Sequence, residues 1–289
     1  MSDANLNWTK PDVAALAQRY PSIMNPSPRG RIVTGAVAFG MVALIAFGAW
    51  WLSLSFARVM SGINQLGLFA WLMMPPNAGS QTALYFKALG ETLAISLLGT
   101  LLGAALAFPL GILAAANVIP SWIFRFSLRR SMDVLRSVDI LVWALIWINV
   151  VGLGPFAGVL AIASSDLGAF GKLFAETIEG ASTKGAEGIR STGGSRLQEL
   201  RFGLIPEVLP VILGTVLYYF ESNTRSATII GIVGAGGIGL HLYEQIRTVE
   251  WQQVSYIIIM ILITVAIIDY GSSKLRAAIA GREPDLSKS

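Results

Sequence analysis

The chain has 289 residues, of which 54% are hydrophobic and only 13% are charged, and its mean hydropathy is +0.64. Soluble domains carry nearer a quarter charged residues, so this composition excludes an ordinary soluble fold and predicts an all-α protein that crosses a membrane several times. The absence of cysteine excludes disulfides and thiolate metal sites, and a single histidine, His241, excludes a His-rich metal site.

The N-terminal part predicts an arm, a span and a loop. Residues 1–31 are expected to form a cytoplasmic arm, either a short helix at the lipid headgroups or a disordered tail. Residues 32–57 lack charge and are long enough to cross a bilayer core of ~30 Å. Residues 58–87 are expected to form an apolar periplasmic loop that either lies at the membrane surface or docks an outer partner.

A core of further spans is predicted over residues 88–280. The second span covers 88–116, where small residues recur every fourth position and would let another helix approach closely. A basic loop is expected at 117–136. The uncharged run 140–165 is interrupted by Gly152–Pro155, so hydropathy alone allows either one span or two spans that meet at this turn.

The placement of basic residues decides between these topologies. With two spans, the segments 1–31, 117–136, 172–205 and 272–289 share one side and hold 17 of the 21 basic residues. With one span this bias disappears. Because basic loops stay in the cytoplasm, the sequence predicts six spans, with both termini, including the tail 281–289, on the cytoplasmic side.

The last three spans are predicted at 155–175, 207–220 and 251–270. The first of them carries Asp166 at depth, and an intramembrane acid should face protein or water rather than lipid. Between the first and second lies a polar segment, 177–206, which contains Glu187 and Arg190 on one helix, a helix-ending Gly193, and Pro206 at the entry to the next span.

A glycine-rich stretch, 226–243, is predicted to enter the membrane without crossing it. Its Gly234, Gly236 and Gly239 match G-x-G-x-x-G, but no βαβ unit surrounds them, so a dinucleotide site is not expected. Gly-rich backbone at membrane depth lines a cavity or is buried in protein. Either a gate or plain close packing fits. The residues predicted to line a path or gate are Glu221, Ser222, Asn223, Thr224, Arg225, Ser226, Thr228, Gly234, Gly236, Gly237 and Gly239.

Two roles are open for Arg225, an internal ion pair or a contact with a ligand. Glu221 precedes Arg225 by four residues, which would allow a simple salt bridge. Arginine also suits oxyanions, since its fork makes paired hydrogen bonds. Both interpretations stay open at this point.

Several stretches resemble one family of membrane proteins. Glu187, Gly193 and Pro206 keep the spacing of the EAA motif of ABC-importer permeases, although Gly188, Ile189 and Gly203 depart from it. The stretches VGLGPFAGVLA (151–161), EGIRSTGG (187–194), FESNTRSAT (220–228) and VGAGGIG (233–239) are similar to the phosphonate and phosphite permeases of that superfamily. The resemblance covers roughly residues 80–280 and implies the type I importer fold.

This resemblance implies a function and a set of partners. Two permease copies would form a path through the bacterial inner membrane, two cytoplasmic ATPase subunits would hold ATP and magnesium, and a periplasmic or lipid-anchored binding protein would deliver a phosphonate, phosphite or phosphate. The chain itself would bind no cofactor, metal or nucleic acid. The residues implied at the ATPase-coupling surface are Glu187, Gly188, Arg190, Gly193, Arg196 and Pro206.

Other functions remain as alternatives. An importer permease for another small solute such as an amino acid would have a similar sequence. A self-contained carrier or channel would use Asp166 as a proton or ion site, but the inverted repeats typical of such carriers are not evident. No P-loop and no constellation of nucleophile, base and orienting group points to an enzyme.

Overall fold

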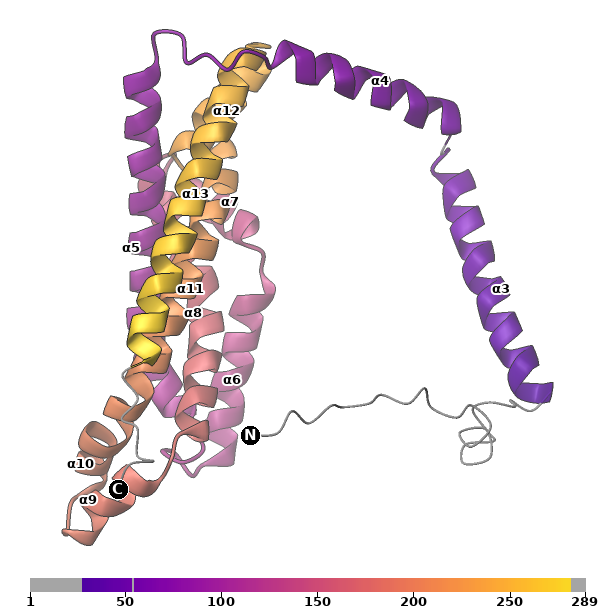
Figure 1. Cartoon of the computed structure of the whole chain (residues 1–289). Helices are drawn as coiled ribbons and strands as arrows, with labels where there is room; N and C mark the ends of the chain where they lie inside the picture. The colour runs from indigo at the N-terminus through magenta and orange to yellow at the C-terminus, as the bar shows by residue number, and fades with distance from the viewer. Residues whose placement is uncertain (1–27, 54, 282–289) are drawn as a thin grey trace, which may run out of the picture. The chain divides into compact units, whose positions relative to one another are not determined.

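The computed structural model describes residues 28–53 and 55–281, and it is helical throughout, with no strand among those residues. Residues 1–27 of the expected arm (1–31) and residues 282–289 of the expected tail (281–289) lie outside the described residues, whereas residues 28–31 of the arm already belong to α3. The helices are α3 (Pro28–Trp51), α4 (Phe56–Leu72), α5 (Thr82–Ala114), α6 (Trp122–Ser137), α7 (Ile140–Val151), α8 (Pro155–Gly180), α9 (Lys184–Ser191), α10 (Arg196–Gln198), a π-helical stretch (Glu199–Leu204), α11 (Ile205–Ile232), α12 (Ile238–Arg247) and α13 (Trp251–Ala280) (Figure 1).

The chain divides into two compact units at Leu68–Phe69. The first contains α3, a helix of 24 residues whose described side chains are mostly exposed and apolar, as expected of a span. The predicted periplasmic loop 58–87 is wrong as a loop: α4 occupies its first part and α5 already begins at Thr82. Residues 56–72 form one continuous helix, α4, with no turn inside it.

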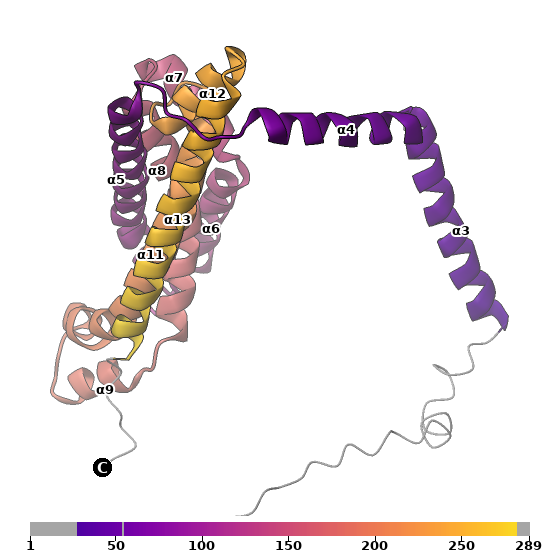
Figure 2. The ribbon, with the colours of Figure 1, turned by 45° about the horizontal axis from the view of Figure 1, so that its top comes forward.

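The second unit is a bundle in which α5, α8, α11 and α13 lie side by side (Figures 1 and 2). The predicted small-residue stripe of α5 packs directly on α8. A Cβ added to Gly99 would lie 2.7 Å from Ile162 Cβ, and one added to Gly111 would lie 2.7 Å from Phe174 Cβ. Larger residues would therefore push the two helices apart, which confirms the close approach predicted from the sequence.

Five described helices are long and apolar enough to cross a membrane, and the count rises to six if the pair α6 and α7 forms one bent span. These two helices meet at 87°. With 12 residues, α7 is only about 18 Å long, so it is too short to cross alone. The prediction of a basic loop at 117–136 is wrong, because most of this segment forms the helix α6.

The turn predicted at Gly152–Pro155 is confirmed. Gly152 and Gly154 adopt φ of +92° and +132°, and Pro155 begins α8. Left-handed conformations are cheap only for glycine, and proline is suited to the first helical turn. These residues therefore end α7 sharply and start α8 in a new direction.

The predicted fifth span, 207–220, is too short. The structure has one continuous helix, α11, of 28 residues from Ile205 to Ile232. The segment 221–228 consequently lies inside this helix rather than at the entrance to a separate re-entrant stretch. The predicted re-entrant stretch 226–243 also divides, because its first residues belong to α11, 233–237 form a turn, and the rest belongs to the short helix α12. The last span, predicted to stop at 270, continues to Ala280 in α13.

Candidate functional site: the coupling segment and the polar residues of α11

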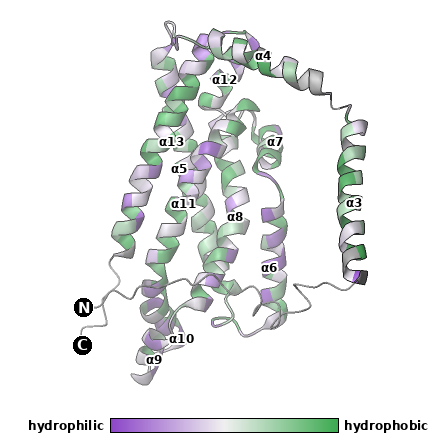
Figure 3. Cartoon of the chain, turned by 45° about the vertical axis from the view of Figure 1, so that its right-hand side comes forward, coloured by the Kyte–Doolittle hydropathy of each residue, from purple (hydrophilic) through white to green (hydrophobic). Residues whose placement is uncertain are grey.

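The polar segment after α8 forms a compact helical hairpin at one end of the bundle, which we call the coupling segment (residues 181–206; Figure 3). Its first helix, α9, ends as predicted at Gly193, whose φ is +81°. Gly193 N donates to Arg190 O at 3.0 Å and Gly194 N donates to Ile189 O at 3.1 Å. This pair of hydrogen bonds is the Schellman pattern that satisfies the last carbonyls of a helix.

The second arm of the hairpin also begins with a local pattern of hydrogen bonds. Ser195 N donates to Gln198 Oε1 at 2.7 Å, and the Ser195 side chain accepts from the Gln198 backbone, so a capping box starts α10. The chain then continues through the π-helical stretch into α11, where Pro206 occupies the first turn as predicted. The coupling segment and α11 are therefore one continuous helical path.

An ion pair and a glycine contact hold the two arms of the hairpin together. Arg190 Nε and Nη2 donate to the two carboxylate oxygens of Glu199 at 3.0 and 2.8 Å. These hydrogen bonds lower the pKa of the Glu199 carboxyl below its usual value. On the other face, a Cβ on Gly203 would lie 2.8 Å from Ala186 N. Gly203 departs from the EAA pattern, and the close crossing of α9 explains why a glycine stands there.

The described side chains predicted for the coupling surface are all exposed. Glu187 does not pair with Arg190 but accepts a hydrogen bond from Thr183 Oγ1 at 2.7 Å. A side chain at Gly188 would meet nothing within 4 Å. Glu187 and Arg196 line a cavity of about 440 Å³ between α9, α10 and the loop that follows α5. The segment thus presents a concave, mixed polar and apolar surface.

A second constellation lies inside the bundle, where α5, α8 and α11 meet. Asn223 Nδ2 donates to Asp166 Oδ2 at 2.6 Å and to Thr100 Oγ1 at 2.8 Å. Next to it, the hydroxyls of Ser96 and Thr224 are 3.3 Å apart. Asp166 is 3% exposed, so of the two predicted surroundings, protein or water, the structure shows protein. Buried polar groups of this kind hold helices in register because each needs its partner.

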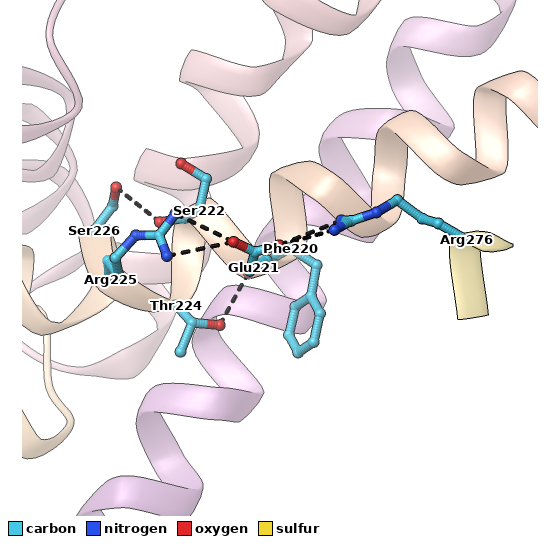
Figure 4. Close-up of polar contacts among 7 residues, drawn as sticks. All are labelled: Phe220, Glu221, Ser222, Thr224, Arg225, Ser226 and Arg276. Carbon is cyan, nitrogen blue, oxygen red and sulfur yellow. Dashed lines mark hydrogen bonds and ion pairs between the residues drawn. The ribbon is translucent and has the colours of Figure 1, made fainter. Parts of the chain in front are cut away.

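The predicted path residues of α11 therefore do not form one lining. Asn223 and Thr224 point into the bundle, whereas Arg225 is on the exposed side and Ser222 is half-buried. Glu221 is nearly buried and faces both Arg225 and Arg276, the latter from α13 (Figure 4). The predicted i,i+4 ion pair thus exists, and Arg276 is an additional partner that sequence analysis missed, because it lies 55 residues further along the chain.

The glycine-rich turn lies at the other end of α11 and joins four segments. Gly237 N donates to Glu91 Oε1 at 3.1 Å, and Ile238 N donates to Thr92 Oγ1 at 2.8 Å, so α5 caps the start of α12. Gly154 N donates to Gly234 O at 3.0 Å. Close contacts leave little room for side chains at these glycines. A Cβ on Gly236 would lie 2.7 Å from Glu91 Oε1, and one on Gly239 would overlap Thr228 O.

The comparisons with known proteins agree with this arrangement. The family described as "Binding-protein-dependent transport system inner membrane component" matches residues 107–273. The chain belongs to this family. The matched residues include the coupling segment, the polar residues of α11 and the glycine-rich turn. Membership of this family favours an importer permease over a self-contained carrier. Its relatives are transport permeases rather than enzymes.

Individual relatives and structures extend the similarity. A phosphite transport system permease protein of Stutzerimonas stutzeri is 33% identical over 83% of this chain and 86% of its own length. A phosphate-import permease protein of Mycolicibacterium smegmatis is 37% identical over 77% of this chain and 44% of its own length. An inward-facing MetNI methionine ABC transporter shares 18% identity with a TM-score of 0.63 over 70% of this chain and 99% of that chain, which shows a common fold.

Proposed function

We propose that this chain is the membrane subunit of an ATP-driven importer that carries phosphonate, phosphite or phosphate across the bacterial inner membrane. The relatives named for phosphite transport and phosphate import support this substrate class, because they match most of the chain. The half-exposed Arg225 on α11 supplies the kind of donor that binds oxyanions. The membrane path forms between two copies of the chain and opens alternately to each side.

The observation that carries the proposal is the continuity of the coupling segment with α11. Arg190 and Glu199 brace α9 against the return arm, and Ser182 N donates to Glu207 Oε1 at 2.8 Å, which ties the start of the segment to α11. A pull on α9 is therefore passed to a helix that carries the polar residues of the path. Two ATPase subunits, which hold ATP and magnesium, supply that pull when they close. This chain binds no cofactor of its own.

The distribution of charge supports an orientation. The coupling segment and the C-terminal end of α13 lie at the same end of the bundle (Figure 1), and both are rich in basic residues. By the positive-inside rule this end is cytoplasmic, and so are both termini. The glycine-rich turn then faces the outer side, where a periplasmic or lipid-anchored binding protein delivers the oxyanion.

Reconstitution tests the proposal directly. The chain is assembled in proteoliposomes with its cognate ATPase and binding protein, and uptake of phosphite, inorganic phosphate and methylphosphonate is measured, with methionine as the competing class of substrate. We expect ATP-dependent uptake of at least one phosphorus oxyanion and stimulation of ATP hydrolysis by the loaded binding protein. Uptake of methionine alone, or ATP hydrolysis that ignores the binding protein, would contradict the assignment.

A double variant tests the coupling segment separately. Glu187→Ala combined with Gly193→Pro removes a surface acid and forbids the left-handed turn. We expect the protein to insert in the membrane but to lose assembly with the ATPase or uptake. Gly271→Ala in α13 is the control, because an added methyl group there meets nothing within 4 Å and the residue lies outside the coupling segment. Normal uptake by the double variant would show that the segment is not the mechanical link.

A further inference from the structure

A cluster of hydrogen bonds joins three helices just before the coupling segment begins. Arg129 of α6 donates from Nη2 to Glu179 Oε1 of α8 at 2.6 Å. Nε and Nη2 of the same guanidinium also donate to Ala114 O, at the end of α5, at 3.1 and 3.0 Å. The same oxygen of Glu179 accepts from Ala116 N, in the loop that follows α5. We call Ala114, Ala116, Arg129 and Glu179 the clasp.

The clasp satisfies groups that the ends of helices leave unpaired. Ala114 is the last residue of α5, and the last carbonyls of a helix lack partners within it. Arg129 donates to this carbonyl and to a carboxylate at once, which the planar fork of a guanidinium allows and a lysine ammonium does not match. Nearby, Asn117 Nδ2 donates to Ile178 O, in the last turn of α8, at 2.8 Å. The ends of α5 and α8 are therefore both tied to α6.

The clasp is next to the coupling segment along the chain and shares a buried cluster with it. Glu179 precedes the first residue of the segment, Ala181, by two positions. Ala115, which lies between two residues of the clasp, belongs to the same buried apolar cluster as Leu204 of the coupling segment. A displacement of α9 and α10 therefore reaches the clasp through the backbone of α8 and through this cluster.

We propose that the clasp is a second link between the coupling segment and the membrane helices, with Arg129 and Glu179 as its positioning residues. This inference rests on the proposed function. The continuous path from the coupling segment into α11 moves one helix, whereas the clasp passes the same displacement to α5 and α6. The ends of these helices then move as one body when the ATPase subunits close. Without the clasp, α11 moves and α6 stays behind.

A second ion pair between the same two helices provides a matched control. Lys172 of α8 donates to Asp133 of α6 at 3.1 Å. The exposed fractions of these side chains, 32% and 27%, nearly equal those of Arg129 and Glu179, 31% and 27%. Lys172 lies seven residues, or about 10 Å, further from the coupling segment along α8. The control pair therefore joins α8 to α6 with similar exposure but away from the ends of the helices.

Uptake per ATP hydrolysed tests the link, with the reconstituted importer and with radiolabelled inorganic phosphate and methylphosphonate as probes. We expect Arg129→Gln to lower this ratio about fivefold, because the ATPase subunits still close but α5 and α6 no longer follow. Lys172→Gln should keep the ratio within about twofold of wild type. Equal ratios in the two variants would overturn the clasp as a link.

A milder variant keeps the test open if Arg129→Gln does not assemble with the ATPase. Arg129→Lys retains the positive charge beside Glu179 but loses the fork that also reaches Ala114 O. We expect it to lower uptake per ATP hydrolysed at least about twofold. A ratio equal to that of wild type in Arg129→Lys would then overturn the proposal.

Spin labels measure the movement itself, because the chain contains no cysteine that would be labelled in addition. Ser127→Cys on α6 and, in a separate protein, Val211→Cys on α11 introduce labels at exposed positions. The distance between the labels of the two copies is measured in the assembled importer, with and without ATP and vanadate. We expect ATP to change both distances in the otherwise wild-type chain. With Arg129→Gln, the change should disappear at Ser127→Cys and persist at Val211→Cys, and any other result would overturn the link.

The outcomes separate this inference from the proposed function. A wild-type complex that imports neither anion, or that gives no distance between two copies, contradicts the proposed function itself. A wild-type complex that imports them while Arg129→Gln keeps the wild-type uptake per ATP hydrolysed overturns the clasp alone.

Discussion

The coupling segment and the polar core of the membrane bundle both contain hydrogen-bonded polar side chains, but the partners are close in sequence in the first and distant in the second. In the coupling segment, Arg190 and Glu199 are nine residues apart and form their pair at an exposed surface. In the bundle, Asn223 joins Asp166 and Thr100, which are 57 and 123 residues away. The first region is built from local contacts and can move as one piece. The second depends on three helices that meet, so it fixes their relative positions.

This difference predicts which part of the chain moves during transport and which part stays rigid. Exposed ion pairs contribute little free energy, so the hairpin keeps its shape mainly through its glycine turn and its close crossing at Gly203. Buried polar groups are costly to leave unpaired, so the bundle should resist changes among α5, α8 and α11. We expect variants in the bundle to reduce stability and variants in the coupling segment to reduce coupling.

The largest effect is expected at Gly239. A Cβ there overlaps Thr228 O and lies 3.0 Å from Gly231 Cα, so Gly239→Val must separate α11 from α12. We expect a loss of about 3 kcal/mol in the free energy of unfolding, measured by denaturant titration in detergent. Gly214→Ala is the control, because its methyl group meets nothing within 4 Å. Equal stability of the two variants would contradict the close packing.

A smaller loss is expected at Asn223. Asn223→Ala removes the hydrogen-bond donor to the buried Asp166 carboxyl, and we expect it to cost about 2 kcal/mol in the same titration. Asp166→Asn should cost less, because a neutral amide retains an acceptor and needs less solvation. Asn149→Ala, at an exposed position in α7, should have little effect. If Asn223→Ala is as stable as Asn149→Ala, the network does not hold the helices together.

The turn of the coupling segment predicts a still smaller effect on stability with a larger one on transport. Gly193→Ala forces a side chain into a left-handed conformation, φ +81°, at a cost of about 1 kcal/mol. Gly271→Ala lies in α13, where an added methyl group meets nothing within 4 Å, and should be neutral or slightly stabilising. We expect the first variant, and not the second, to lower binding-protein-stimulated ATP hydrolysis. A reversed order would argue against a fixed hairpin.

The smallest change in stability is expected for the exposed pair of the hairpin. Arg190→Glu should lower the melting temperature slightly and reduce coupling, because two carboxylates then face each other. The double variant Arg190→Glu with Glu199→Arg restores opposite charges and should recover both properties. The measurement is a thermal melt together with ATP hydrolysis in the assembled complex. No recovery in the double variant would mean that Arg190 acts through the ATPase surface rather than through Glu199.

Much of the coupling segment was predictable from sequence because its interactions are local. Gly193, Pro206 and the exposed character of Glu187 follow from turn and helix chemistry within a few residues. The boundaries of the spans were less predictable. The charged and polar residues 221–226 led to a predicted span that stops at 220, but their partners in other helices allow α11 to continue through them. Likewise, the arginines of α6 suggested a loop, although Arg129 pairs with Glu179 of α8.

The sequence by itself determined the family, the polytopic helical class, the turn at Gly152–Pro155 and the position of the coupling segment. The family follows from the resemblance of short stretches to known permeases, the turn from the distribution of basic residues along the chain, and the rest from composition and short-range geometry. The tertiary structure alone decided that Glu91 caps α12, that Arg276 joins Glu221, and that Asn223 reaches Asp166. These partners are 55 to 146 residues apart, and no local pattern records which faces of distant helices pack together.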